Sequence, residues 1–178
     1  MPNDGPGNLK LPRGSISGGL ARGFAHDQSR TSIGRGEDAF EAAKREFEQW
    51  AMFDLGWVWV VNPAASIATG QVVAVDVCTF GLWSLNLSRI VDVLDTGGLF
   101  GFIYATTAMH GAHGEESFLL ELDESTGDVW YELEAVSHPQ NALARLGFSV
   151  TRSFQRRFAR DSHRRMQAEA VGKTLLIS

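Results

Sequence analysis

Hydrophobic and polar residues follow two different periods along the chain, and the first clear period is helical. Over residues 37–53 the apolar side chains of Phe40, Ala43, Phe47 and Trp50 recur at spacings of three or four, with charged residues on the opposite face. This pattern is typical of an amphipathic helix. Glu37 lies in its first turn, where the helix dipole favours negative charge.

Six extended segments follow this helix. They are separated by turns rich in Gly, Asn and Asp, and they cover residues 57–61, 71–78, 83–94, 99–107, 115–123 and 128–137. Connections this short predict antiparallel neighbours, because parallel strands need a long crossover. Residues 23–33 are also compatible with extended backbone, so we expect a further strand there, at one edge of the sheet.

The helical period returns near the end of the chain. Apolar residues at Leu143, Leu146, Val150, Phe154, Phe158 and Met166 form one stripe. A helix over residues 139–170 is about 45 Å long, which suits a position diagonally across a curved sheet. We therefore predict an α+β fold. A curved antiparallel sheet of six or seven strands wraps around a long C-terminal helix, and one or two helices precede the second strand.

Length and composition indicate one domain. The chain has 178 residues, and residues 1–36 contain eight of its 19 glycines and three of its five prolines. We expect a flexible arm over residues 1–22, a single domain over residues 23–172 and a short tail over residues 173–178. The lone cysteine, Cys78, excludes an internal disulfide and a zinc site built on paired thiolates. We expect neither a cofactor nor a metal.

Charge and hydropathy narrow the class of partner. The net charge of −5 gives no global positive field, so nucleic acid is not expected as a partner. No apolar run approaches the roughly 20 residues needed to cross a bilayer. The N-terminus lacks the basic-then-apolar order of a signal peptide, so we expect a cytoplasmic protein.

A curved sheet cannot close completely onto a straight helix. The space between them is either filled by large side chains or left as a cavity for a small hydrophobic or amphipathic ligand. The candidate ligand-binding residues are Trp57, Trp59, Trp83, Arg89, Phe102, Tyr104, Phe118, Trp130, Tyr131 and Phe154. Trp130 and Tyr131 are adjacent in one strand, so which of them points inward is left open by the alternation.

Arg89 is conspicuous because it falls on the apolar side of its strand. In residues 83–94, Trp83 and Leu85 alternate with polar residues, and Arg89 continues the apolar row. Burying an arginine is costly unless a carboxylate pairs with it, and Glu115 and Glu116 are possible partners. Such a pair would orient a polar ligand group; the alternative is an arginine that extends to solvent at the rim of the sheet.

Four segments of the chain resemble a known family. They are IGRGEDAFEAAKREFEQWAMF, GFIYATTAMHGAHGEE, GEESFLLELDESTGDVWYELEAVSHP and ALARLGFSVTRSFQRRFARDS, within residues 22–170. Together they resemble the DUF1990 family, a domain of unknown function found in bacterial and plant proteins. The order of its elements is similar to that of the helix-grip (SRPBCC) superfamily of START-type lipid-transfer domains, polyketide cyclases and birch-pollen-allergen-like proteins. This resemblance implies a pocket for a hydrophobic small molecule, without implying a reaction.

Two other functions are consistent with the residues. In a cyclase- or hydrolase-type enzyme, His110, His113 or Glu116 would be the general acid or base at the mouth of the pocket. In an interaction module, the arginine-rich C-terminal helix would bind a polyanion or a partner. Residues 115–134 are strongly acidic, however, so this helix could instead meet its complement within the same molecule.

Overall fold

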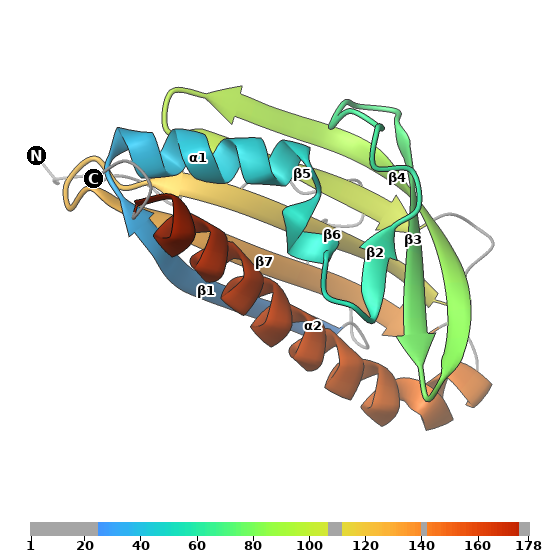
Figure 1. Ribbon diagram of the computed structural model, residues 1–178. Coiled ribbons are helices and arrows are strands. Elements are labelled where there is room, and N and C mark those ends of the chain that lie inside the picture. Colours follow the sequence, from blue (N-terminus) through green and yellow to red (C-terminus); the bar gives the residue numbers. More distant parts are fainter. Residues whose placement is uncertain (1–24, 107–111, 140–141, 175–178) are drawn as a thin grey trace, which may run out of the picture.

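An antiparallel sheet of seven strands curls around one long helix in the computed structural model of this protein (Figure 1). The structure describes residues 25–106, 112–139 and 142–174. The strands lie in the order β1-β7-β6-β5-β4-β3-β2. The elements are β1 (Ala25–Arg35), α1 (Glu37–Glu48), the 3-10 helix η1 (Ala51–Phe53), β2 (Val58–Val60), β3 (Val72–Thr79), β4 (Leu82–Thr96), β5 (Leu99–Thr106), β6 (Ala112–Leu122), β7 (Asp128–Pro139) and α2 (Ala142–Thr174).

The predicted fold class is confirmed. The expected edge strand is β1, which pairs with β7, and all neighbouring strands are antiparallel. Several boundaries differ from the sequence prediction, and two of the differences concern the helices. Trp50 adopts a left-handed conformation (φ 61°), so the predicted helix over residues 37–53 is divided into α1 and η1. Pro139 ends β7 instead of opening the last helix, which begins at Ala142.

The core lies between the concave face of the sheet and the helices. Phe47 of α1 is fully buried, and its ring meets those of Phe100, Phe102 and Tyr131 edge-on, with centroids 5.3–6.4 Å apart. Phe102 stacks on Phe118 of the next strand at 5.0 Å. Each aromatic side chain buried in this way contributes roughly 1.5–3 kcal/mol, so this cluster is a large part of what attaches α1 to the sheet.

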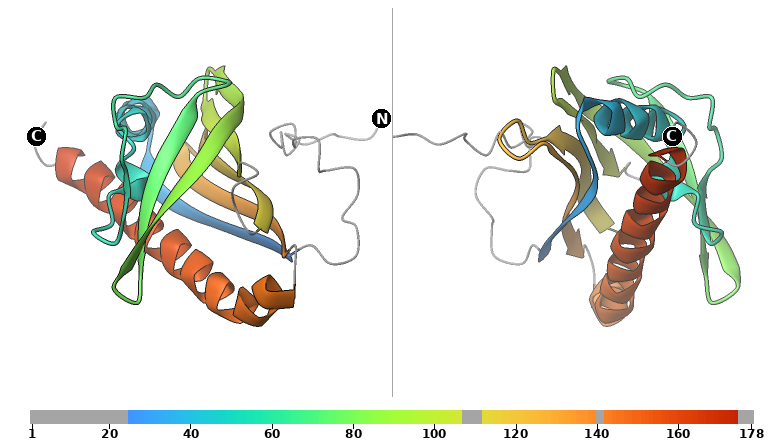
Figure 2. Two further views of the ribbon diagram at one scale, coloured as in Figure 1. Left: turned by 90° about the vertical axis from the view of Figure 1, so that its right-hand side faces the viewer. Right: turned by 60° about the vertical axis from the view of Figure 1, so that its left-hand side comes forward.

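Helix α2 crosses the open side of the curved sheet, and the two views of Figure 2 show it lying along the concavity. Phe158 packs on Phe53 and Phe118, with ring centroids 5.3 and 6.2 Å apart. Ser162 is fully buried, and its hydroxyl lies 2.8 Å from the hydroxyl of Tyr131 on β7. Apolar packing and one buried hydrogen bond thus hold the helix to the sheet.

The two faces of β4 are the reverse of what the sequence pattern suggests. The apolar row is on the outside: Trp83 is 49% exposed and Leu85 is 59% exposed. The alternating row of polar residues lies on the concave side, where Ser88 and Ile90 are buried. A bulge at Val91 shifts the register between Ile90 and Asp92. One inserted residue exchanges the two faces of the strand. Beyond the bulge, the apolar row therefore points inward.

Candidate ligand pocket

A pocket of about 670 Å³ lies between the concave face of the sheet and the first half of α2, and it is open to solvent on one side. Strands β1, β3, β4, β5, β6 and β7 form its floor, and Phe53, Trp57 and Val58 line it from η1 and the start of β2. Helix α2 contributes Phe154, Gln155, Arg156, Phe158 and Ala159 to its wall. The curl of the sheet therefore leaves space that the side chains on both sides do not fill.

One wall of the pocket is aromatic. Phe53, Trp57, Phe118, Phe154 and Phe158 all line it. The indole nitrogen of Trp57 donates a hydrogen bond of 3.2 Å to Asp161 on α2. The guanidinium of Arg157 covers the outer face of the same indole, 4.2 Å from the ring centre. Trp57 is thereby held against the helix, and this wall has a fixed position.

A tyrosine–glutamate pair forms the polar part of the floor. Tyr104 and Glu116 lie directly opposite each other in the β5–β6 register, and the Tyr104 hydroxyl donates a hydrogen bond of 2.6 Å to Oε2 of Glu116. Burial raises the pKa of Glu116, although the bond from Tyr104 opposes this shift. Burial, together with the nearby Glu116 carboxylate, raises the pKa of Tyr104 well above its ordinary value. Tyr104 is therefore a neutral hydrogen-bond donor at physiological pH.

Further polar groups reach the pocket from three elements. Ser84, Asn86 and Ser88 of β4 line it because the bulge at Val91 places this polar row inside. Asp27 lines it from β1, in the same cross-strand row as Glu116. Gln155 lines it from α2, and its Oε1 is buried with no hydrogen-bond partner in the described part of the structure. The pocket therefore combines apolar walls with several hydrogen-bond acceptors.

The chemistry available in this pocket is that of a carboxyl group. Glu116 can accept a hydrogen bond or a proton from a molecule bound against it, and Tyr104 fixes the orientation of its carboxylate. Within the described ranges, no group of His, Cys, Asp and Glu side chains is arranged to hold a metal ion.

The structure brings five of the candidate residues from the sequence together in this pocket. They are Trp57, Tyr104, Glu116, Phe118 and Phe154. Phe102 and Tyr131 are not among the residues that line the pocket, and both are fully buried in the core. Trp130 points to the outer face, where the guanidinium of Arg30 lies 4.6 Å from its ring centre. The choice between Trp130 and Tyr131 is thus resolved: Tyr131 faces inward.

Three further candidate residues lie on the outer face of the sheet, away from the pocket. Trp59 and Trp83 contact each other there, with ring centroids 4.1 Å apart, and are 38% and 49% exposed. Arg89 is exposed as well, and its guanidinium donates to the backbone oxygen of Gly70 at 3.2 Å, not to a carboxylate of β6. The row of β4 that carries Trp83 and Arg89 was assigned to the interior because it is apolar, and the bulge places it outside.

The two candidate histidines cannot be placed in the pocket. His110 lies outside the described residues. His113 belongs to β6, where its backbone pairs with His138 of β7, but its side chain lies outside the described part. Glu116 is therefore the member of the proposed acid–base set that the structure locates.

Several residues that line the pocket were not among the sequence candidates. Asp27, Ser84, Asn86, Ser88 and Gln155 were missed. The serine and asparagine residues form the polar row of β4, and the alternation alone would place this row in solvent. A single extra residue in a strand leaves no clear mark on the alternation around it, so the sequence offered little signal for the true assignment.

Three of the described arginines of α2 pair with nearby acids. Arg157 and Arg160 both pair with Asp161, at 3.4 and 3.1 Å, and Arg165 pairs with Asp54 at 2.9 Å and with Glu169 at 2.6 Å. Two acids of the stretch over β6 and β7 have partners on β1. Glu121 pairs with Arg30 of β1 at 2.7 Å, and Asp128 lies 3.9 Å from Arg35 of the same strand.

None of the helices in the described ranges is both long and apolar enough to cross a bilayer.

Comparison with protein families shows which family the chain belongs to. The model of the DUF1990 family, a domain of unknown function, matches residues 12–165. This chain belongs to the DUF1990 family. A UPF0548 protein of Dictyostelium discoideum is 35% identical to the DUF1990 chain over 160 residues, which is 84% of this chain and 74% of the relative. A UPF0548 protein of Deinococcus radiodurans is 33% identical over 156 residues, 80% and 76% of the two chains.

Solved structures with the same architecture are more distant in sequence. Ara h 8.0201 superposes on the DUF1990 chain with a TM-score of 0.58 at 14% identity, covering 84% of this chain and 99% of its own. The Zhui aromatase/cyclase of Streptomyces gives a TM-score of 0.60 at 16% identity, covering 85% and 96%. Norcoclaurine synthase of Thalictrum gives 0.55 at 7% identity, covering 85% and 95%. At these identities the likeness establishes the helix-grip fold alone.

Proposed function

We propose that this protein binds a small hydrophobic or amphipathic molecule in the pocket between the sheet and α2. The observation that carries the proposal is the pocket itself: about 670 Å³ of space, with aromatic walls and a hydrogen-bonding pair on its floor. Ligand sites in proteins have volumes of roughly 300–1,000 Å³ and combine apolar lining with a few placed polar groups. The resemblance to helix-grip proteins supports the same function.

The size and the polarity of the pocket describe the ligand in general terms. The space accepts a molecule the size of a fatty amine, a medium-chain alcohol or a fused aromatic ring system, and the open side gives it an entry path. Phe118, Phe154 and Phe158 would contact its apolar part. Tyr104 and Glu116 would meet its polar end, because they are neighbours on the floor and share one hydrogen bond.

A neutral fluorescent dye, N-phenylnaphthylamine, tests this proposal. Ala135 lines the pocket from β7, so Ala135→Phe places a ring in the cavity and should weaken dye binding about tenfold or more. Val136→Phe is the matched control, because the adjacent residue of a strand points to the other face of the sheet. Its dye affinity should equal that of the wild type.

Two results would contradict the proposal. One is a wild-type protein that does not bind the dye, and the other is equal affinity in both phenylalanine variants. Circular dichroism melting curves establish that each variant is folded. Should Ala135→Phe not fold, Ala159→Leu narrows the same pocket from α2, and the same loss of affinity is expected.

A further inference from the structure

The carboxylate of Glu116 has a hydrogen bond but no opposite charge. Tyr104 donates to its Oε2 at 2.6 Å, and in the parts of the chain that the structure describes no lysine or arginine pairs with it. Glu116 sits in the wall of the pocket with partial access to solvent through it. A charge in such surroundings is costly unless a counter-charge is supplied, and the pocket is where a counter-charge can enter.

The charges around the pocket favour a cation. Asp27 faces it from β1, in the same row as Glu116 and separated from it by Ala135 of β7. Among the described residues of its wall the one cation is Arg156, which is exposed on α2. Aromatic side chains also line the pocket, and the face of an aromatic ring attracts a cation.

The described residues that line the pocket include one buried polar atom without a hydrogen-bond partner, and it is an acceptor. Oε1 of Gln155 is buried on α2 without a hydrogen-bond partner in the described structure, and Gln155 lines the same pocket. An ammonium group carries three hydrogen-bond donors and no acceptor, so it complements a site that offers a carboxylate and an amide oxygen. A carboxylate or phosphate ligand would bring further acceptors and a repulsive charge.

We propose that the ligand is an amphipathic amine, whose protonated nitrogen pairs with Glu116 while its apolar part lies against the aromatic wall. This inference rests on the proposed function, since it names the class of molecule that the same pocket takes. Tyr104 is a positioning residue here: its hydrogen bond holds one carboxylate oxygen and leaves Oε1 of Glu116 for the ammonium. The pair therefore selects for amines over alcohols and acids of equal length.

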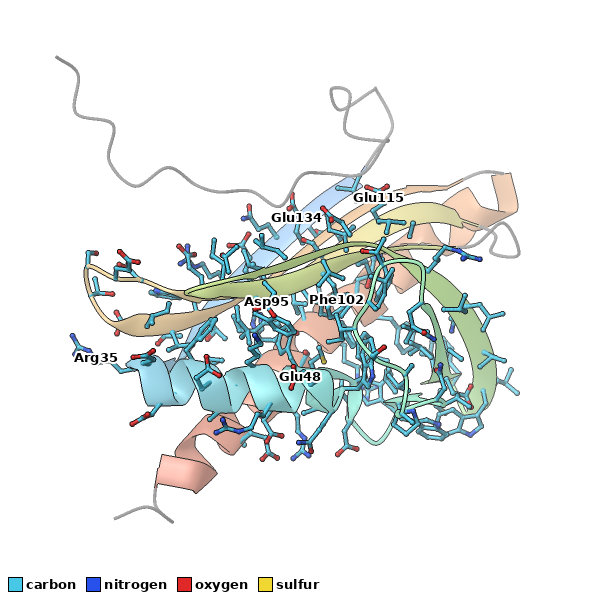
Figure 3. All side chains as sticks on the ribbon, turned by 90° about the horizontal axis from the view of Figure 1, so that it is seen from above. Arg35, Glu48, Asp95, Phe102, Glu115 and Glu134 are labelled. Atoms are coloured by element: carbon cyan, nitrogen blue, oxygen red, sulfur yellow. The ribbon has the colours of Figure 1, made fainter. Side chains whose placement is uncertain are left out.

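Three ligands of one chain length separate charge from apolar contact: octylamine, octanol and octanoate. Each displaces N-phenylnaphthylamine from the wild-type protein at neutral pH, and we expect octylamine to bind at least about tenfold more tightly than octanol, with octanoate the weakest. In Glu116→Gln the affinity for octylamine should fall to that for octanol, which should not change. Glu115→Gln is the matched control, because Glu115 is the preceding residue of β6 and projects from the outer face (Figure 3).

A pH series on the wild-type protein tests the same pairing without a substitution. Lowering the pH protonates Glu116 while the amine stays charged, so the preference for octylamine over octanol should disappear as the pH falls. Among the described residues, the other charged or titratable ones that line the pocket are Tyr104 from β5, Asp27 from β1, Glu134 from β7 and Arg156 from α2. Glu116→Gln separates the effect of Glu116 from that of the other groups, because that variant should show no preference at any pH.

The outcomes distinguish this inference from the proposed function. If the dye and octanol bind but octylamine has no advantage, or if Glu116→Gln keeps the advantage, the amine assignment is wrong and the pocket remains a binding site. If octanoate binds most tightly, the sign of the charge is wrong. If neither the dye nor any of the three ligands binds, both proposals fail together.

Discussion

The hydrogen bond between Tyr131 and Ser162 offers a quantitative test of how α2 is held to the sheet. Both side chains are fully buried, and their hydroxyl oxygens are 2.8 Å apart. Ser162→Ala leaves the Tyr131 hydroxyl buried without this partner, which should lower the free energy of unfolding by about 1–3 kcal/mol. Tyr131→Phe should cost only about 1 kcal/mol, because a helical serine can turn to the carbonyl of the residue four positions earlier.

The double variant shows whether the loss of stability comes from the hydrogen bond between the two hydroxyl groups. Once both hydroxyls are gone, no polar group is left unpaired, so the double variant should be at least about 1 kcal/mol more stable than the sum of the single losses predicts. Equilibrium unfolding in urea, followed by tryptophan fluorescence, measures each free energy. For a chain of this size, 1 kcal/mol corresponds to a shift of about 2–4 °C in Tm.

The control for this cycle is Ser153→Ala, since Ser153 is an exposed serine of the same helix and should change stability by less than about 0.5 kcal/mol. If the loss of stability in the double variant equals the sum of the two single losses to within about 0.5 kcal/mol, the reasoning is refuted, because the effects of independent sites add.

Three further predictions concern single positions. A Cβ on Gly101 would lie 2.3 Å from the backbone oxygen of Phe118, so Gly101→Ala should force β5 and β6 apart and lower the free energy of unfolding by about 2 kcal/mol or more in urea titrations; an unchanged midpoint would contradict this. Phe80 is 82% exposed and adopts a left-handed conformation (φ 52°) before Gly81. The pair Asn-Gly suits such a hairpin turn, so Phe80→Asn should raise the free energy of unfolding by up to about 1 kcal/mol. A loss of that size would show that the exposed ring is held by packing. Burial raises the pKa of Glu116 above its ordinary 4.5, so the folded state binds a proton on this carboxyl group more tightly than the unfolded state does, and the stability gained from that proton is lost as the pH rises above 4.5. Relative to the wild type, Glu116→Gln should therefore gain stability over that range. A stability difference that does not change with pH would argue against the raised pKa.

The order of the elements was predictable because it depends on patterns that extend over many residues. The spacing of Phe40 and Phe47 marks α1, and the stripe through Phe154 and Phe158 marks α2. Short connections between extended segments required antiparallel strands, and the structure has them. Each of these signals is repeated several times, so an irregularity at one residue does not remove it.

The faces of β4 were not predictable because they depend on one residue. With Val91 bulged, Ser84, Asn86 and Ser88 turn toward the pocket, and the row of Trp83 and Arg89 turns toward solvent. The rule that apolar rows are buried gave the opposite result for this half of the strand. The polar floor of the pocket is a consequence, because a buried apolar row would have placed Trp83 and Leu85 in the space that is now open.

The sequence also does not show which side chains of β6 and β7 point toward the pocket. Glu115 and Glu134 project from the outer face, while Phe102 projects toward the helices (Figure 3). Glu115 and Glu116 are adjacent and chemically alike, so composition cannot say which one enters the pocket. The register of β6 against β5 answers this question, because it sets Glu116 directly opposite Tyr104.

The position of a bound ligand is the most direct test of the account. Amide chemical-shift mapping of isotope-labelled protein during a titration with octanol reports that position without any substitution. We predict that the perturbed residues are those of the concave face and of α2, with Phe118, Ala135 and Phe158 among the largest shifts. Shifts confined to the exposed apolar side chains of the outer face, around Trp59 and Trp83, would show that apolar molecules bind there and that the pocket is not the site.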